Sequence, residues 1–368
     1  MQKEASYTNP RVFVSDCEGP ISKNDNAFEL ARNIISDGAH FFTLISKYDD
    51  VLADIVKKQG YKAGDTLRLI LPFLKAYGAT DKKIRDFSTK NILLVPGAKD
   101  TLRFVMKIMP SFIVSTSYKQ YISALCTLTD FPFENTFCTQ LNMEKYEIPP
   151  EEAKRLKELG KEITALPIIK IPKNATSVSE FSRIDQETIE RLDEIFWKEI
   201  PQMNAGRMLT EVNPVGGAEK AKAVKEIAKK MGYSLGNVMY VGDSITDIQA
   251  LMLVRQNGGL AVSFNGNSYS VKESDVAVLS GDTIVTSVLA EVFSRLGKEG
   301  ALGIINEWNH FGLKKYCNVA ELRERMFRVF GSIFPQVERV TSGNVDRLII
   351  ESSFFRKTVR GEAIGKLG

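Results

Sequence analysis

Aspartates follow two apolar stretches of this sequence, at positions where a carboxylate could do chemistry. The stretch RVFVS runs directly into Asp16, and Gly19 and Pro20 then break the pattern. β-Branched and aromatic residues in a short run predict a buried strand, so Asp16 is expected at its carboxyl end. Ligands of open α/β sheets bind just outside such strand ends, where a carboxylate can act as a nucleophile or hold a cation. Taken alone, Asp16 also fits a simple turn or helix cap.

A second acidic site lies in VMYVGDSITDIQAL. Asp243 follows the predicted strand NVMYV and Gly242, and Asp247 comes four residues later, at the start of a predicted helix. This spacing puts both carboxylates on one side of the turn, and converging carboxylates make an oxygen-rich site suited to Mg²⁺. Helix capping would explain Asp247, but it would not explain the Gly-Asp pair at the strand end.

Two more positions carry groups that could bind phosphate oxygens. Ser115, with Thr116 beside it, ends a strand predicted at 112–114, where a hydroxyl can donate to phosphate, although serine is also ordinary in turns. Lys220 begins a helix predicted at 219–231. A solvated helix face would also explain this lysine, because the same helix carries Lys222, Lys225, Lys229 and Lys230.

Alternating strands and helices must position these candidates. The turn at Pro96-Gly97, a helical pattern at 98–108 and the strand before Ser115 predict a β-α-β crossover, which returns the chain to a parallel sheet. Further strands are predicted at 135–138, 260–264 and 275–280, a helix at 119–128 and an extended segment at 207–215. The predicted fold class is therefore α/β, with a Rossmann-like parallel sheet.

The order and spacing of these motifs resemble the haloacid dehalogenase-like superfamily. DCEGP at Asp16, FIVSTS at Ser115, EKAKAV at Lys220 and VGDSITD at Asp243 are similar to its four motifs, and the resemblance covers residues 11–20, 92–140 and 208–285. It implies that Asp16 is a nucleophile forming an aspartyl-phosphate. It also implies a family core with helical caps.

The same resemblance implies roles for the other candidates. Ser115, Thr116 and Lys220 would bind the phosphoryl oxygens. Mg²⁺ would be held by Asp16, Glu18 through its backbone carbonyl, Asp243 and Asp247. Phosphoryl transfer needs an in-line nucleophile and positive charge around the phosphoryl oxygens, and this set of residues meets both needs.

Glu18 departs from the common family pattern, which is Asp-x-Asp. A glutamate at this position can still act as the catalytic acid and base, but its extra methylene moves the carboxyl by about one bond length. The DxEGP form resembles a poorly characterised archaeal branch of the superfamily. Some members of that branch carry names that tie them to a membrane hydrogenase complex.

Long insertions separate the motifs and predict a division into parts. Residues 1–20, 92–143 and 208–285 are expected to form the core, 21–91 a helical cap insertion and 144–207 a second insertion. Residues 286–368 read as a helical C-terminal extension whose apolar faces should pack on the core or form a homodimer contact. A cap over the strand ends would exclude water and select the substrate.

Composition restricts the class of protein. The net charge of +4 over 368 residues, without a basic run interleaved with aromatics, does not indicate a nucleic-acid partner. Four scattered cysteines and two distant histidines make a zinc site unexpected. The first residues lack an apolar signal-peptide core, and no apolar run is long enough for membrane insertion, so we expect a cytoplasmic protein.

The function predicted from the sequence is a Mg²⁺-dependent phosphohydrolase that acts on a small phosphorylated metabolite. Two alternatives stay open. One is phosphotransfer to an acceptor other than water, as in phosphomutases. The other is a non-catalytic interaction subunit of a larger, hydrogenase-associated complex, which Glu18 and the long helical C-terminal region favour.

Overall fold

The computed structural model describes residues 11–365 and 367. This part of the chain forms a seven-stranded sheet in the order β3-β2-β1-β4-β5-β6-β7, and only the pair β6–β7 is antiparallel. The strands are β1 (Val12–Ser15), β2 (Ser111–Tyr118), β3 (Thr136–Thr139), β4 (Val238–Gly242), β5 (Leu260–Phe264), β6 (Val276–Leu279) and β7 (Gln336–Arg339). Because β1 and β4 are parallel neighbours, with Ser15 paired to Val241, Asp16 and Asp243 leave the sheet at the same edge.

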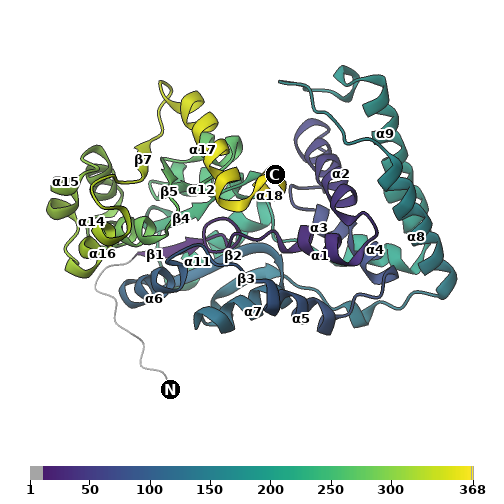
Figure 1. Ribbon diagram of the computed structural model, residues 1–368, viewed down its shortest axis with the longest axis horizontal. Helices are drawn as coiled ribbons and strands as arrows, with labels where there is room; N and C mark the ends of the chain where they lie inside the picture. The colour runs from purple at the N-terminus through teal and green to yellow at the C-terminus, as the bar shows by residue number, and fades with distance from the viewer. Residues whose placement is uncertain (1–10, 366, 368) are drawn as a thin grey trace.

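Helices cover both faces of this sheet, as Figure 1 shows. Side chains alternate along β1, so Val12 and Val14 pack in one apolar cluster and Phe13 packs in another on the opposite face. The helices of this region are α6 (Ala98–Ile108), α7 (Lys119–Thr129), α11 (Ala218–Met231), α12 (Ile248–Gln256) and α13 (Ser268–Glu273). Fully burying each large apolar side chain stabilises the fold by about 1.5–3 kcal/mol. The predicted α/β class is confirmed.

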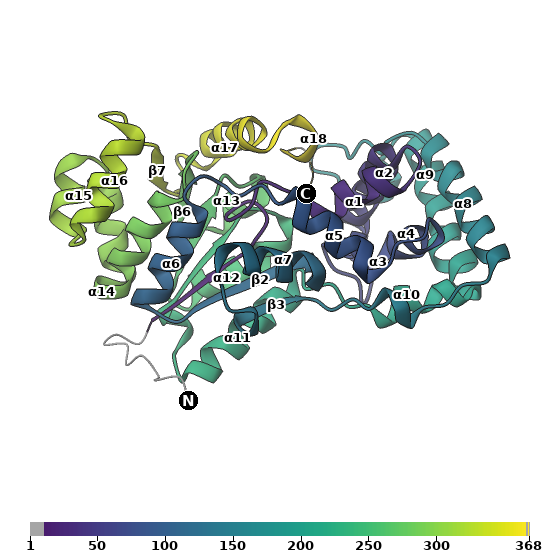
Figure 2. The ribbon, with the colours of Figure 1, turned by 60° about the horizontal axis from the view of Figure 1, so that its bottom comes forward.

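The two insertions pack together. They contain α1 (Asn26–Ile34), α2 (Gly38–Asp50), α3 (Thr66–Leu69), α4 (Leu71–Ala76), α5 (Asp81–Asn91), α8 (Pro150–Ala165) and α9 (Arg183–Glu194), and α10 (Arg207–Glu211) follows the second insertion. Buried side chains from Ala27 to Val212, joined by Leu367, form one apolar cluster, here called the insertion cluster. Figure 2 shows these helices at one end of the molecule, beside the sheet. The predicted division into core and cap stays a proposal.

One local prediction in this region was wrong. Residues 207–215 were expected to be extended, but Arg207–Glu211 is the short helix α10. Met208 and Leu209 are adjacent in sequence and both buried in the insertion cluster. A helical turn can place two such neighbours against one surface, whereas a strand would point them to opposite faces.

The C-terminal region is helical, as predicted, and it packs on the core. Its helices are α14 (Ile284–Asn306), α15 (His310–Tyr316), α16 (Ala320–Phe330), α17 (Val345–Arg360) and α18 (Glu362–Gly365). α14 contacts α6 and β5, and α17 contacts α13 and β6, while the predicted homodimer contact stays a prediction. None of the described helices combines the length and the apolar character needed to cross a membrane.

Strand β7, between α16 and α17, was not anticipated from the sequence. It closes the edge of the sheet beside β6, and of its four residues only Val337 is buried. A four-residue strand with one apolar side chain gives no periodicity to recognise. β7 determines where α17 begins, because the turn after β7 leads the chain back across the sheet as α17.

Candidate active site

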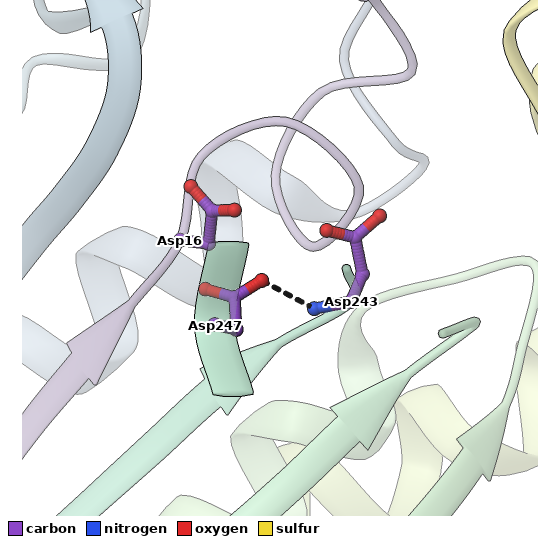
Figure 3. A group of neighbouring side chains, drawn as sticks. All are labelled: Asp16, Asp243 and Asp247. Atoms are coloured by element: carbon purple, nitrogen blue, oxygen red, sulfur yellow. Dashed lines mark hydrogen bonds between the residues drawn. The ribbon is translucent and has the colours of Figure 1, made fainter. Parts of the chain in front are cut away.

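Three buried carboxylates meet at the carboxyl ends of β1 and β4. Asp16, Asp243 and Asp247 each offer one oxygen, and these oxygens lie within 4.8 Å of one another. Figure 3 shows Asp16 at the end of its strand, with the other two on the chain that leaves β4. The Asp16 amide donates to the Val241 carbonyl at 2.8 Å, so the pairing of the strands continues to this residue and fixes its position.

Two glycines make this close approach possible. Gly19 has φ +109°, and a Cβ added there would overlap the Asp243 carboxylate. A Cβ at Gly242 would lie 2.6 Å from Cγ of Asp247. Both glycines of the DCEGP and VGD motifs are therefore required sterically by the aspartates they accompany.

Lys220 connects two of the carboxylates. Its side chain is fully buried, and Nζ lies 2.7 Å from Oδ2 of Asp16 and 2.8 Å from Oδ1 of Asp247. On the same helix the Lys222 side chain is 65% exposed. The solvated helix face, which the sequence left open for Lys220, applies to Lys222 instead.

Asp247 is bonded through both of its oxygens. Oδ1 also accepts from the Tyr240 hydroxyl at 2.7 Å, and Oδ2 accepts from the amides of Asp243 and Ser244 at 3.0 Å each. The Asp247 side chain makes no cap hydrogen bond to the following helix α12, and it belongs instead to a capping box with Ser244. In this arrangement Asp247 fixes the turn that carries Asp243 and holds Lys220, and its role as a metal ligand stays a prediction.

Burial and the neighbouring charges change the pKa values of these groups in different directions. Burial acts to raise the pKa of Asp16, while the Lys220 ammonium, 2.7 Å from Oδ2, acts to lower that pKa and favours the carboxylate. Burial also acts to raise the pKa of Asp247, but Lys220 and the Tyr240 hydroxyl hold it below its usual value. Burial acts to lower the pKa of Lys220, yet Asp16 and Asp247 raise it overall, so the ammonium stays charged.

The hydroxyls of Ser115 and Thr116 line the same cavity as the aspartates, but they lie within β2, because the strand predicted at 112–114 continues past them to Tyr118. Ser115 is buried, and its Oγ accepts from the Ser117 amide at 3.2 Å. The Thr116 hydroxyl donates to the Val215 carbonyl at 3.1 Å. Because the Thr116 proton is already committed, Ser115 is the better placed of the two to donate to a ligand.

Glu18 is half-buried and connects to the insertions. Its Oε1 accepts from the Asn26 amide, the first of α1, at 2.6 Å. Burial and the nearby Asp25 raise the pKa of Glu18, and the Asn26 bond and Arg360 oppose them without reversing the shift. The sequence alone left this direction open. A raised pKa suits a group that must give up a proton near neutral pH.

A cavity of about 100 Å³ joins these groups to the insertions. Asp16, Glu18, Ser115, Thr116 and Asp243 line it from the core. Its remaining lining residues are Asp25, Phe42, Ser46, Asp49, Asp50, Gly64, Thr66, Leu67, Ser244, Ile245, Thr246, Arg356, Arg360 and Leu367. The insertions and the C-terminal helices therefore complete the walls of the cavity.

Sequence reasoning missed two arginines of this cavity. Arg356 and Arg360 on α17 both form ion pairs with Oδ2 of Asp243, the second at 3.1 Å. Their spacing of four residues puts them on one face of the helix, but this spacing does not show whether that face is buried or solvated. The signal is therefore absent from the local sequence.

The donor set fits a hard divalent cation. All three side chains of the cluster are carboxylates, and oxygen is the ligand atom that Mg²⁺ takes in proteins. The hydrogen bonds made to the Asp243 carboxylate by the described residues use Oδ2. Asp16, Asp243 and the carbonyl of Glu18 are the residues that would hold the ion.

Comparisons with known proteins agree with this arrangement. The model of a family described as haloacid dehalogenase-like hydrolase matches residues 102–280, a range that contains Ser115, Lys220, Asp243 and Asp247 and begins after Asp16. The resemblance seen in the motifs is thereby confirmed. A comparison with curated proteins gave no match.

One solved structure supports the fold along nearly the whole chain. A gene product of Archaeoglobus fulgidus is 25% identical, with a TM-score of 0.78 that covers 97% of this chain and 99% of the other. A phospho-aspartyl intermediate analogue of phosphoserine phosphatase is 14% identical, with a TM-score of 0.43 and coverage of 77% and 98%. A substrate-bound phosphoserine phosphatase complex is 13% identical, with a TM-score of 0.43 and coverage of 78% and 98%.

Proposed function

Since this chain carries a haloacid dehalogenase-like hydrolase domain, we propose that it is a Mg²⁺-dependent phosphohydrolase acting on a small phosphorylated metabolite. The observation that carries the proposal is the placement of Asp16. Its carboxylate stands at the strand end, 2.7 Å from the buried Lys220 ammonium and beside the Asp243 and Asp247 carboxylates. Asp16 and Asp243 thus line one cavity, and the buried Lys220 ammonium contacts Asp16.

In the first step an oxygen of Asp16 attacks phosphorus, and the bond from phosphorus to the ester oxygen breaks. The leaving alkoxide takes a proton from the Glu18 carboxyl, which the raised pKa keeps available. Lys220 and Ser115 bind the phosphoryl oxygens as negative charge redistributes over them. The product of this step is an aspartyl-phosphate on Asp16 and a free alcohol.

In the second step water hydrolyses that intermediate. The Glu18 carboxylate removes a proton from water, whose oxygen attacks phosphorus, and the bond to Asp16 breaks. Asp16 leaves as a carboxylate, Glu18 is protonated again and inorganic phosphate is released. The Asn26 bond to Glu18 makes this acid–base group depend on where α1 lies.

The charges of the site suit a metal and a phosphate that bind together. Three cations, Lys220, Arg356 and Arg360, already face the three clustered carboxylates. When bound, Mg²⁺ would offset charge on the phosphoryl oxygens and lower the repulsion between Asp16 and phosphate. A dication and a phosphate dianion add no net charge to the site.

The size of the cavity favours a small substrate. The cavity measures about 100 Å³, and the insertions and α17 form part of its walls. We propose that the two insertions together serve as the cap that selects the substrate. A folded phosphoprotein would need a more open surface.

The test is a screen of phosphorylated metabolites and an aryl phosphate with Mg²⁺, comparing wild type with Asp16→Asn. We expect wild-type turnover that EDTA removes and Mg²⁺ restores. Asp16→Asn should lower turnover by several orders of magnitude, because the attacking charge is lost. Asp130→Asn is the matched control, since Asp130 is an exposed surface aspartate whose side chain is 61% accessible.

Trapping and product analysis complete the design. Beryllofluoride should modify the wild type at Asp16 and leave Asp16→Asn unmodified. Phosphate appearing on an added alcohol, in place of inorganic phosphate, would indicate a phosphotransferase. Full activity in EDTA, or full activity of Asp16→Asn, would reject the mechanism.

A further inference from the structure

The C-terminal helices border the active-site cavity. α17 lies on α13 and β6, and beyond it Ile364 and Leu367 pack against the insertion cluster. Figures 1 and 2 show α17 and α18, in yellow, running from the sheet toward the helices of the insertions. One face of α17 therefore forms a wall of the cavity, and Arg356 and Arg360 lie on that wall.

Arg360 uses all of its nitrogen atoms in bonds to the protein. Nη1 donates to Oδ2 of Asp243 at 3.1 Å, Nε donates to the Lys23 carbonyl at 3.0 Å, and Nη2 donates to the Asn24 carbonyl. Lys23 and Asn24 lie on the segment between the Asp16 turn and α1. Arg360 therefore connects α17 to Asp243 at the strand end and to the segment that leads from the Asp16 turn into α1.

Arg356, one helical turn earlier, is different. It is 3% exposed, and Nη1 donates to Oδ2 and to the carbonyl of Asp243. Its Nε is buried and has no hydrogen-bond partner among the described residues. Proteins satisfy nearly all buried donors, so such an exception in a cavity wall points to a missing acceptor.

A phosphoryl group is the acceptor that the cavity best suits. Arg356 lines the same cavity as Asp16 and Ser115, where the transferred group must sit. Lys220 uses two of its three N–H donors in its contacts with Asp16 and Asp247. The planar fork of a guanidinium matches phosphate geometry, and a cation held by Asp243 would repel Arg356 toward other acceptors.

We propose that Arg356 is a phosphoryl-binding residue of this active site, presented by the C-terminal helix, and that Arg360 is the positioning residue that holds it in place. The proposal rests on the proposed phosphohydrolase function. It makes α17 part of the active site as well as part of the core packing.

The experiment measures the affinity for inorganic orthophosphate, in the presence of Mg²⁺, by isothermal titration calorimetry on the full chain. Arg356→Met should weaken orthophosphate binding by about 10- to 100-fold, the usual effect of losing a hydrogen bond to a charged group. Arg356→Lys keeps the charge but loses the fork, so its affinity should fall between the two. Arg347→Met is the control, because Arg347 is on the outer face of α17, bound to Glu338 and Glu351, and it should bind like wild type.

Arg360→Met tests the positioning role through a double-mutant cycle. Alone, it should weaken orthophosphate binding because Arg356 is no longer held. In an Arg356→Met background the same change should have no further effect. Additive effects of the two changes would overturn the positioning role.

The remaining outcomes separate this proposal from the proposed function. If the wild type is active and Arg356→Met has the same orthophosphate affinity and the same KM as the wild type, the role of Arg356 alone is overturned. An equal loss in Arg347→Met would also overturn it, because the effect would then belong to helix packing. A wild type that neither binds orthophosphate nor turns over a phosphate ester would overturn both proposals. If Arg356→Met does not fold, Arg356→Lys decides by the same criterion.

Discussion

Replacing Lys220 by methionine should destabilise the protein far more than the loss of an ordinary lysine. Methionine keeps much of the side-chain volume but removes the charge between Asp16 and Asp247, whose side chains are 6% and 0% exposed. Removing one partner of a buried ion pair costs about 3–5 kcal/mol, whereas an exposed pair is worth about 1 kcal/mol or less. We therefore expect the free energy of unfolding at pH 7 to fall by about 3–5 kcal/mol.

The pH dependence of this loss follows from Asp247. In the wild type Lys220 helps to hold the pKa of Asp247 below its usual value, which stabilises the folded state above the unfolded pKa. Without Lys220, burial raises that pKa, and this stabilisation is lost. The difference between Lys220→Met and wild type should therefore be full only above the raised pKa of Asp247 in the variant, shrink as pH falls through that pKa, and disappear below the lowered wild-type pKa.

A second substitution should partly repair the first. In Lys220→Met/Asp247→Asn, the Asn oxygen can accept the amides of Asp243 and Ser244, and its NH₂ can donate to the Tyr240 hydroxyl. No uncompensated charge then remains at position 247, so the double variant should be more stable than Lys220→Met.

The assay is urea unfolding of both variants and of Lys222→Met. Lys222 is the exposed neighbour on α11, so its replacement should change stability by no more than about 0.5 kcal/mol. A loss below about 1 kcal/mol in Lys220→Met would refute the assignment of a buried ion pair. A double variant less stable than Lys220→Met would refute uncompensated charge as the cause.

Three further outcomes are expected. Gly19→Ala should displace Asp243 and introduce strain at φ +109°. Both the affinity for Mn²⁺, measured by titration, and the stability to urea should therefore fall. Unchanged values of both would show that the turn can relax. Burial raises the pKa of Asp49 to about 7, so the protein should lose stability as pH rises from about 4 to about 7. Urea unfolding at pH 5 and pH 7.5 should show a smaller loss of stability in Asp49→Asn than in the wild type. An equal loss in both proteins would contradict this prediction. Mg²⁺ should raise the melting temperature of the wild type but not of Asp243→Asn, as measured by differential scanning fluorimetry, and an equal rise in both would place the ion elsewhere.

Local patterns were sufficient to predict the strands and helices that carry the motifs. The helix expected at 98–108 is α6 with the same bounds, and the strand expected at 260–264 is β5. The convergence of Asp16, Asp243 and Asp247 also followed, because parallel strands end at one edge of the sheet. In each case the contacts that determine the element or the site are between residues close in sequence, or they follow from the direction of the strands.

What the sequence did not predict depends on contacts between distant segments. Arg356 is separated by 113 positions from Asp243, and nothing in the composition of α17 distinguishes it from a solvent-facing arginine. The same applies to Asn26, whose amide binds Glu18 only because α1 begins beside the Asp16 turn. Strand β7 pairs with a segment about sixty residues earlier in the chain, and its polar sequence does not reveal that.

The position of α17 has a consequence for the order in which the active site is made. Asp16 emerges early in synthesis, but Arg356 and Arg360 follow all the other residues that line the cavity except Leu367. Domains fold progressively as the ribosome releases them, at about 5–20 residues per second. The core sheet can therefore assemble while Asp243 still lacks its two arginine partners, and the carboxylate cluster would carry excess negative charge until α17 docks. A nascent chain would then be most open to a divalent cation before its last helices are in place.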